Sequence, residues 1–317
     1  MLNRRILRIK AFKVLYAYAE NQDLTLKQVL GCLETSLEAT RDLYLYMIAL
    51  IPALTQEAAR RVEAARGKFN PTQEEKNPNL KFVENAVSAL LADDTDFQRL
   101  LEKKKLSWEQ NDALLNQLWE NLKKRDYFQA YMASPVHSLA EDAAFWKEFF
   151  RQELEDDNAL AAILEDASVF WADDLGYVLG TCLNSLDGIA RSGRWDYPPL
   201  YQSEVLERRG KAVASDSDFV RNLVTAAYGR FAEYNSLVAS SVSKWDQDRL
   251  VATDTVLIGL GLAEAETFPD IPVKVTINEY VEISKYYSTP KSHGFVNGLL
   301  DRLIKERVDE GKITKNL

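Results

Sequence analysis

Cysteine and histidine are scarce in this 317-residue chain, which has two of each. Two cysteines and two histidines spread along the chain form no cluster with zinc-ligand spacing, and one cysteine pair is too little to indicate an oxidising compartment. Cys32 and Cys182 both lie in apolar, helix-like segments, which is typical of buried structural thiols. We therefore expect no catalytic residue, no metal site and no cofactor, and we predict that the protein is not an enzyme.

Long hydrophobic runs are also missing. The apolar run at residues 47–54 is interrupted by Pro52, whereas a membrane-spanning helix needs roughly 20 apolar residues. At the amino terminus, apolar residues alternate with Arg and Lys, unlike the unbroken apolar block of a secretory signal. With 46% hydrophobic residues, the chain can bury a core, and we expect a cytoplasmic protein without membrane contact.

Alternating strand patterns are scarce, and apolar residues recur at helical spacing almost throughout the chain. This pattern predicts an all-α fold. Two loop-like segments, residues 67–79 and 191–199, interrupt it with Gly, Pro and Asn. We predict three regions: amino-terminal helices at 1–50, an inserted helical region at 51–204, and carboxy-terminal helices at 205–317.

Charge is distributed unevenly along the chain. The first thirteen residues carry five positive charges and no acid, although the whole chain has a net charge of −9. Residues 68–202 carry 24 acids against 14 bases, and they also hold five of the six tryptophans. Large aromatics at helical spacing are typical of a core, so we predict a self-packed insert with an acidic surface. The alternative is an acidic surface that mimics nucleic acid or competes for the basic amino-terminal helix.

The first helix has two candidate faces. Apolar residues gather on one side, and a cation with aromatic neighbours lies on another. The first set is Leu7, Ala11, Val14 and Tyr18, the second is Arg5, Ile9, Phe12 and Tyr16, and Arg4 and Arg8 share a further strip. The mixed face suits single-stranded nucleic acid, because cations neutralise phosphate while aromatic planes stack on unpaired bases. A helix buried on both sides fits the same spacing.

Helix signals recur near the carboxy terminus. Thr276 and Glu279 have capping-box spacing, which predicts a helix that begins there. Ser288 followed by Pro290 predicts the start of the next helix. Gly298 lies inside that second helix, where glycine costs about 1 kcal/mol relative to alanine, so we expect a close helix contact at this position.

Residues 271–285 and 291–301 form a carboxy-terminal signature, and residues 4–16 form an arginine-rich first helix. In these segments the chain resembles the NusB family of bacterial transcription antitermination factors. Residues 218–224 and 254–264 resemble two further helices. The resemblance covers residues 1 to about 50 and about 205 to 306 and leaves the middle region unexplained.

This resemblance implies an all-helical fold of two small subdomains, here with an additional inserted region. It also implies a transcription antitermination role in which the protein binds single-stranded RNA, the boxA element of nascent ribosomal RNA. The implied partners are a NusE-like ribosomal protein of the small subunit and the RNA polymerase antitermination complex.

The resemblance carries functional residues over by position. The expected RNA-binding residues are Arg4, Arg5, Arg8, Lys13, Tyr16, Lys291 and Phe295, and the expected partner-binding residues are Tyr18, Asp254 and Glu279. The three arginines have no acid three or four positions later in the sequence to neutralise them. Where family members commonly have Arg and Tyr, this chain has Gly259 and Ala263, so contacts from those two side chains are absent.

Two other functions are compatible with the sequence. One is a non-catalytic helical interaction scaffold whose insertion binds a protein partner. The other is an accessory module of a ribosomal RNA methyltransferase, because a NusB-like domain occurs joined to such enzymes. The chain has neither a glycine-rich cofactor loop nor a candidate catalytic cysteine, which argues against the second.

Overall fold

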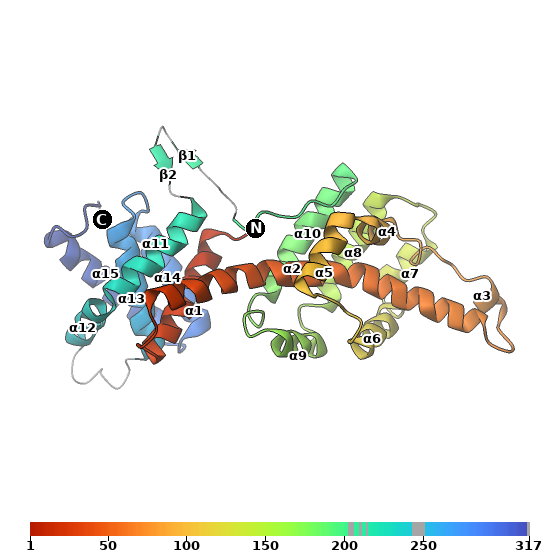
Figure 1. The fold of residues 1–317 in the computed structure, drawn as a ribbon, viewed down its shortest axis with the longest axis horizontal. Helices are drawn as coiled ribbons and strands as arrows, with labels where there is room; N and C mark the ends of the chain where they lie inside the picture. Colours follow the sequence, from red (N-terminus) through yellow and green to blue (C-terminus); the bar gives the residue numbers. More distant parts are fainter. Residues whose placement is uncertain (202–205, 209–210, 214, 243–250, 316–317) are drawn as a thin grey trace. The chain divides into compact units, whose positions relative to one another are not determined.

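The chain folds into two compact units. The structure, a computed structural model, describes residues 1–201, 206–208, 211–213, 215–242 and 251–315. Unit 1 comprises residues 1–37 and 200–317, and unit 2 comprises residues 38–199. The all-α fold is confirmed: within the described residues the sole sheet is a hairpin of β1 (Leu206–Arg208) and β2 (Lys211–Val213) (Figure 1).

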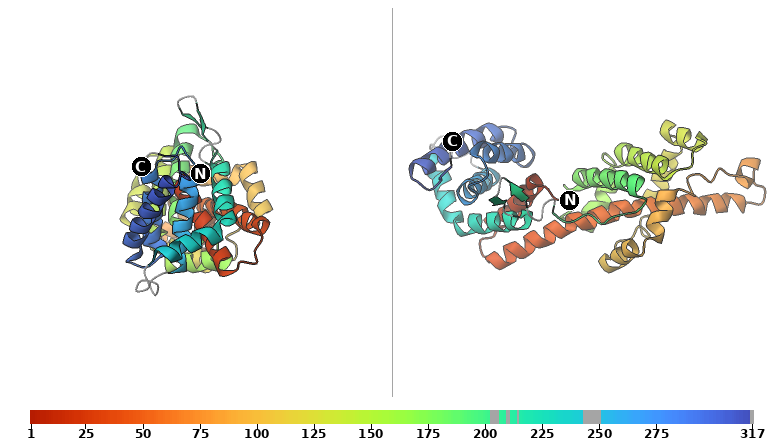
Figure 2. Two further views of the ribbon diagram at one scale, coloured as in Figure 1. Left: turned by 90° about the vertical axis from the view of Figure 1, so that its left-hand side faces the viewer. Right: turned by 90° about the horizontal axis from the view of Figure 1, so that it is seen from above.

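Unit 1 joins helices from both ends of the sequence. They are α1 (Arg4–Glu20), the first turns of α2 (Leu26–Arg66), α11 (Asp216–Gly229), α12 (Phe231–Ser241), α13 (Ala252–Thr267), α14 (Val273–Tyr287) and α15 (Ser292–Asp309). Figures 1 and 2 show red α1 among the turquoise and blue helices. The Leu2 amide also donates to the Leu200 carbonyl at 2.7 Å, which fixes the chain ahead of α1.

Helix α13 is the centre of unit 1. It packs against α1, α11, α12, α14 and α15, and every residue from Val256 to Ala265 is buried. A helix that is apolar on all sides belongs in the interior of a bundle. At Gly261 a Cβ atom would lie 2.7 Å from Leu300 and 3.3 Å from Tyr280, so only glycine permits this close packing.

The predicted close contact at Gly298 is wrong. A Cβ added to Gly298 meets no described atom within 4 Å, because this position on α15 faces open space. The crowded glycine of unit 1 is Gly261, on the neighbouring α13.

The predicted capping box is also wrong. Helix α14 begins at Val273 after Pro272, so Thr276 already lies in the second turn. The Thr276 hydroxyl donates to Glu264 and the Glu279 carboxylate accepts from Arg5, so both side chains make long-range contacts instead of a cap. Ser288 ends α14, and α15 begins later, at Ser292.

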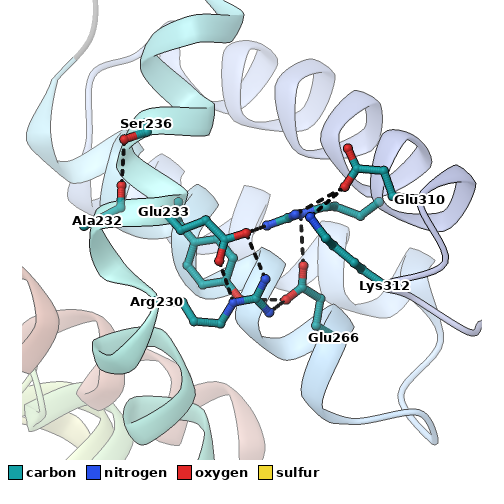
Figure 3. A network of polar contacts seen from close by, with 9 residues as sticks. Arg230, Ala232, Glu233, Ser236, Glu266, Glu310 and Lys312 are labelled. Carbon is teal, nitrogen blue, oxygen red and sulfur yellow. Dashed lines mark hydrogen bonds and ion pairs between the residues drawn. The ribbon is translucent and has the colours of Figure 1, made fainter.

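A network of ion pairs ties α12, α13 and α15 together (Figure 3). Arg230 contacts Glu233 at 2.9 Å and also pairs with Glu266. Arg307, whose side chain is buried, reaches Glu233 and lies 3.1 Å from Glu266. The side-chain hydrogen bond from Arg230, with a second from Arg307, lowers the pKa of Glu233 to about 2.

Unit 2 contains the remainder of α2 and eight further helices. They are α3 (Gln73–Lys76), α4 (Ala86–Asp93), α5 (Thr95–Lys104), α6 (Asp112–Leu122), α7 (Asp126–Ala133), α8 (Leu139–Glu153), α9 (Asn158–Ala167) and α10 (Leu175–Ser192). Helix α8 packs against α4, α7 and α10. The long helix α2 therefore contributes residues to both units.

Aromatic rings fill the interior of unit 2. Phe82 contacts Trp119, Phe128, Phe145 and Trp146 at ring-centroid distances of 5.3–5.7 Å. Four tryptophan N–H groups donate to Tyr46 O, Asn85 Oδ1, Ala39 O and the Tyr44 hydroxyl. The expectation that the tryptophans of the middle region form a core is confirmed.

The unit boundaries differ from the predicted regions. The first boundary lies inside α2, between Leu37 and Glu38, where the sequence shows no loop because the helix continues. The second lies between Pro199 and Leu200. The predicted boundary between residues 204 and 205 falls outside the described residues.

Candidate nucleic-acid interface

Helix α1 is covered on more than one side. Its predicted apolar residues Leu7, Ala11 and Val14 are buried, and so are Arg8, Lys10, Phe12 and Leu15. Phe12, which we placed on the mixed face, is 3% exposed. The exposed surface of α1 is therefore narrower than the residue spacing predicted.

Each arginine of α1 pairs with an acid that is distant in the sequence. Arg4 Nε lies 2.7 Å from Asp216 of α11, and its guanidinium covers the Phe219 ring at 4.1 Å. Arg8 pairs with Glu264 of α13, and Arg5 pairs with Glu279 of α14. The premise that these arginines are not neutralised is therefore wrong, because their partners come from three other helices.

Arg8 is an interior residue. Its side chain is 4% exposed and donates two hydrogen bonds, of 2.7 and 2.8 Å, to the fully buried Glu264 carboxylate. The Thr276 and Tyr280 hydroxyls also donate hydrogen bonds to that carboxylate, at 2.8 and 3.1 Å. Burial opposes the charge of Arg8, but the hydrogen bonds that Arg8 donates to Glu264 outweigh it, and the pKa of Arg8 is raised. The Arg8 side chain thus offers almost no exposed surface in this structure.

Arg5 is the most accessible arginine of the three. Its side chain is 52% exposed and holds Glu279 through two parallel hydrogen bonds of 3.0 and 2.8 Å. The side-chain hydrogen bond between them raises the pKa of Arg5 and lowers that of Glu279. A phosphate would compete with Glu279 for this guanidinium, since both offer two oxygens in similar geometry.

Helices α1 and α14 lie side by side in the same direction. Arg5 contacts Glu279, and eight residues further along both helices Lys13 Nζ lies 5.6 Å from the centre of the Tyr287 ring. Phe12 packs on the same ring at 5.5 Å. Tyr16, half-buried, continues the row 6.1 Å from Phe12. The α1–α14 face, defined by Arg5, Lys13, Tyr16, Glu279 and Tyr287, thus combines cations with aromatic rings.

Lys291 and Phe295 lie at the turn from α14 into α15. Lys291 is exposed and Phe295 is half-buried. The buried Asp254 carboxylate accepts from the Ser288 and Ser292 hydroxyls at 2.6 and 2.8 Å, which fixes this turn relative to α13. Lys291 follows Tyr287 by four residues, so the α14–α15 turn continues from the end of the α1–α14 face.

The three expected partner-binding residues occupy different environments. Asp254 is 2% exposed and holds the α14–α15 turn, and its contact with a partner stays a prediction. Glu279 is engaged by Arg5. Tyr18 is half-buried and packs on Tyr228 and Phe231, at 4.5 and 5.0 Å.

Packing accounts for the small residues in α13. A Cβ on Gly259 would lie 3.6 Å from Tyr234 of α12, and Ala263 is completely buried. A large side chain at either position would therefore need α12 or its neighbours to move. Burial at these positions fits the absence of Arg and Tyr there.

Sequence reasoning missed Tyr286, the residue before Tyr287. Its side chain is 83% exposed. Tyr286 lies seven residues after Glu279, two helical turns, so both belong to the same strip of α14. The usable signal was a pair of tyrosines between Lys285 and Lys291 at a helix end.

Two site classes are not found in the described residues. No group of three or more His, Cys, Asp or Glu side chains is arranged there to hold a metal ion. No helix in the described part of the chain has the length and apolar character to cross a membrane.

Comparison with known proteins identifies the relatives of this chain. The NusB family model matches residues 199–305. Relatives described as transcription antitermination protein NusB come from Salinibacter ruber (32% identical over 101 residues), Methylacidiphilum infernorum (36% over 114) and Thermodesulfovibrio yellowstonii (34% over 107). These alignments cover 32, 35 and 33% of this chain.

Coverage of the relatives is higher than coverage of this chain. The alignments span 63, 70 and 71% of those relatives, in the same order, and 47% of a further NusB from Chloroherpeton thalassium. No solved structure matches the chain. The family match lies almost entirely in unit 1, and residues 1–198, which include α1 and nearly all of unit 2, lie outside it. From these similarities, this chain belongs to the NusB family.

Proposed function

We propose that this protein is an RNA-binding transcription antitermination factor that acts on a boxA-type element of nascent ribosomal RNA. Its partners in this role are a NusE-like small-subunit ribosomal protein and the RNA polymerase antitermination complex. The role needs no catalytic step or cofactor, and we place it in the cytoplasm. The names of the NusB relatives support the general role.

The α1–α14 face is the observation that carries the proposal. On this face Arg5 and Lys13 supply positive charge to neutralise phosphates, and Tyr16 supplies a ring on which an unpaired base can stack. The exposed ring of Tyr286, next to Tyr287 of the face, offers a second stacking surface. Lys291 and Phe295 extend this surface at the α14–α15 turn. We assign Arg4 and Arg8 to positioning, because they fix α1 on α11 and α13.

Salt-dependent titration tests the ionic part of the proposal. A fluorescent boxA-like RNA is titrated with the full chain at several salt concentrations, with and without the NusE-like protein. Arg5→Ala and Lys13→Ala should each weaken binding and reduce the slope of log K against log salt by about 1. Lys305→Ala is the matched control, since it removes an exposed cation paired with Asp301 on α15. Full affinity and slope in both test variants would contradict the proposal.

A stacking variant tests the aromatic part. Tyr286→Ala should weaken RNA binding by about 1–3 kcal/mol without changing the salt slope, because stacking on a base releases no counterion. Tyr286→Phe keeps the ring and should retain affinity. Phe69→Ala, at a fully exposed phenylalanine of unit 2, is the control. If Tyr286→Ala binds normally while Arg5→Ala does not, Tyr286 is excluded and the ionic surface stands.

A further inference from the structure

Unit 2 contains an open groove between α2, α5 and α6. Its volume is about 830 Å³, within the range of roughly 300–1,000 Å³ typical of ligand sites. All of its lining residues belong to unit 2. The groove therefore lies outside the α1–α14 face and outside the part of the chain that matches the family.

Small side chains form the floor of the groove. Ala49, Pro52 and Ala53 of α2 line it, and Pro52 lies inside the helix, where it cannot donate a backbone hydrogen bond. Because these side chains are short, another polypeptide can approach the α2 backbone closely. Leu101 and Leu115 add apolar surface from α5 and α6.

The connection from α5 to α6 forms a fixed wall. The Trp108 ring stacks on Tyr46 with centroids 4.1 Å apart, and its Nε1–H donates to the Tyr46 carbonyl at 2.8 Å. Asn111 donates to the Tyr46 hydroxyl at 2.8 Å. A wall held in this way loses little conformational entropy when a partner binds.

The rim of the groove carries unbalanced negative charge. Glu57 is buried at the edge, and Arg60 and Arg61 neutralise it at 2.6 and 2.5 Å. Glu102, Glu109 and Asp112 are exposed, Arg60 also acts on Asp112, and the other lining cation is Lys105, so four acids and two cations line the groove. The groove therefore combines an apolar floor with an acidic rim, which repels a phosphate backbone and attracts a cationic partner.

We propose that the α2–α5–α6 groove binds a short amphipathic segment of a protein partner that carries lysine or arginine beside apolar residues. The apolar side chains of the segment occupy the floor at Pro52 and Ala53, and its cations face Glu102, Glu109 and Asp112. This helix-in-groove binding uses one apolar face and one charged face of the segment. It gives unit 2 a function that is independent of RNA binding by unit 1.

A model peptide tests the proposal on the full-length protein. The probe is a fluorescent 18-residue amphipathic helix of leucine and lysine, read by anisotropy at physiological salt. Its control is a peptide of the same composition whose residue order disrupts the apolar face. We expect the amphipathic peptide to bind at least tenfold more tightly than the control peptide. Equal affinity for the two peptides would overturn the proposal.

Protein variants separate the groove from general acidity. The triple variant Glu102→Gln, Glu109→Gln, Asp112→Asn should weaken peptide binding about tenfold, as expected for three exposed charges that each contribute modestly. The control triple variant Glu155→Gln, Asp156→Asn, Glu165→Gln makes an equal charge change at exposed positions near α9 and should change affinity less than twofold. Equal losses in both triples would show attraction by net charge alone.

A filled groove provides the last variant. Ala53 is half-buried on the floor, so Ala53→Phe should remove peptide binding while the thermal unfolding midpoint and RNA affinity stay within error. Normal peptide binding by a folded Ala53→Phe protein overturns the proposal. If that variant unfolds, Gln56→Trp, at an exposed lining position, replaces it with the same expected result.

Discussion

Unit 1 and unit 2 are both built from helices, yet different chemistry fills their interiors. In unit 1, buried ion pairs such as Arg8–Glu264 join α1 to helices from the other end of the chain. In unit 2, aromatic rings pack on one another and tryptophan N–H groups fix their orientation. By sequence, unit 1 has 20 acids and 21 bases, and unit 2 has 28 acids and 18 bases. Unit 1 therefore depends on ion pairs between helices from the two ends of the chain, whereas unit 2 combines an aromatic interior with buried charged groups such as Lys81 and Glu153.

The largest expected effect comes from breaking the buried pair of unit 1. Arg8→Met leaves the fully buried Glu264 carboxylate without its main partner. The free energy of unfolding should therefore fall by about 3–5 kcal/mol. Denaturant titration measures this change. The double variant Arg8→Met, Glu264→Leu removes both charges and should recover part of the loss. A single variant as stable as the unchanged chain would refute the assigned role of the pair.

A core variant of unit 2 should have a smaller effect. Trp146→Phe removes part of a fully buried ring and leaves the side-chain oxygen of Asn85 without the indole donor. The free energy of unfolding should fall by about 1–3 kcal/mol. Separate thermal transitions would assign that loss to unit 2. RNA affinity should not change, because the α1–α14 face lies in unit 1. A drop in RNA affinity in the folded variant would contradict the independence of the units.

Alanine substitutions at two glycines of unit 1 should change the stability of the protein in opposite directions. Gly261→Ala forces a Cβ against Leu300 and Tyr280, which should cost about 1–2 kcal/mol. Gly298→Ala meets open space in α15 and should add about 0.5–1 kcal/mol through helix propensity. The thermal unfolding midpoints of the two variants, compared with that of the unchanged chain, measure these effects. Equal effects from the two substitutions would mean that the close contact at Gly261 is not limiting.

The smallest expected effect concerns acid stability. The pKa of Glu233 is lowered to about 2 in the folded chain, first by hydrogen bonding to Arg230. The stabilisation is therefore complete above pH 4.5, the pKa of a free glutamate, and is lost as the pH falls towards 2. Glu233→Gln should reduce the loss of unfolding free energy between pH 4.5 and 2 by about 1 kcal/mol or less, since solvent screens this partly exposed side chain. If the free energy of unfolding of the Glu233→Gln variant falls as steeply in acid as that of the unchanged chain, Glu233 makes no such contribution to stability.

Local patterns predicted those elements whose burial follows helical spacing. The apolar face of α1 and the aromatic core of unit 2 are two examples. The arginine pairs were not predictable in this way, because Asp216, Glu264 and Glu279 lie more than 200 residues from their partners. Tertiary contacts also explain the false capping box, since Thr276 donates to Glu264 of the preceding helix and Glu279 accepts from Arg5 near the amino terminus. The pairing of α1 with α14, and hence the candidate interface, requires the fold.

The discontinuous composition of unit 1 has a consequence for synthesis on the ribosome. Unit 2 is one continuous stretch and can fold as soon as residue 199 has emerged, whereas Arg8 must wait for Glu264. At roughly 5–20 residues per second, that wait lasts about 10–50 s. During this time α1 is a nascent helix with apolar residues and five cations and without its native carboxylate partners. Timely burial of α1 therefore depends on how quickly the last third of the chain is translated.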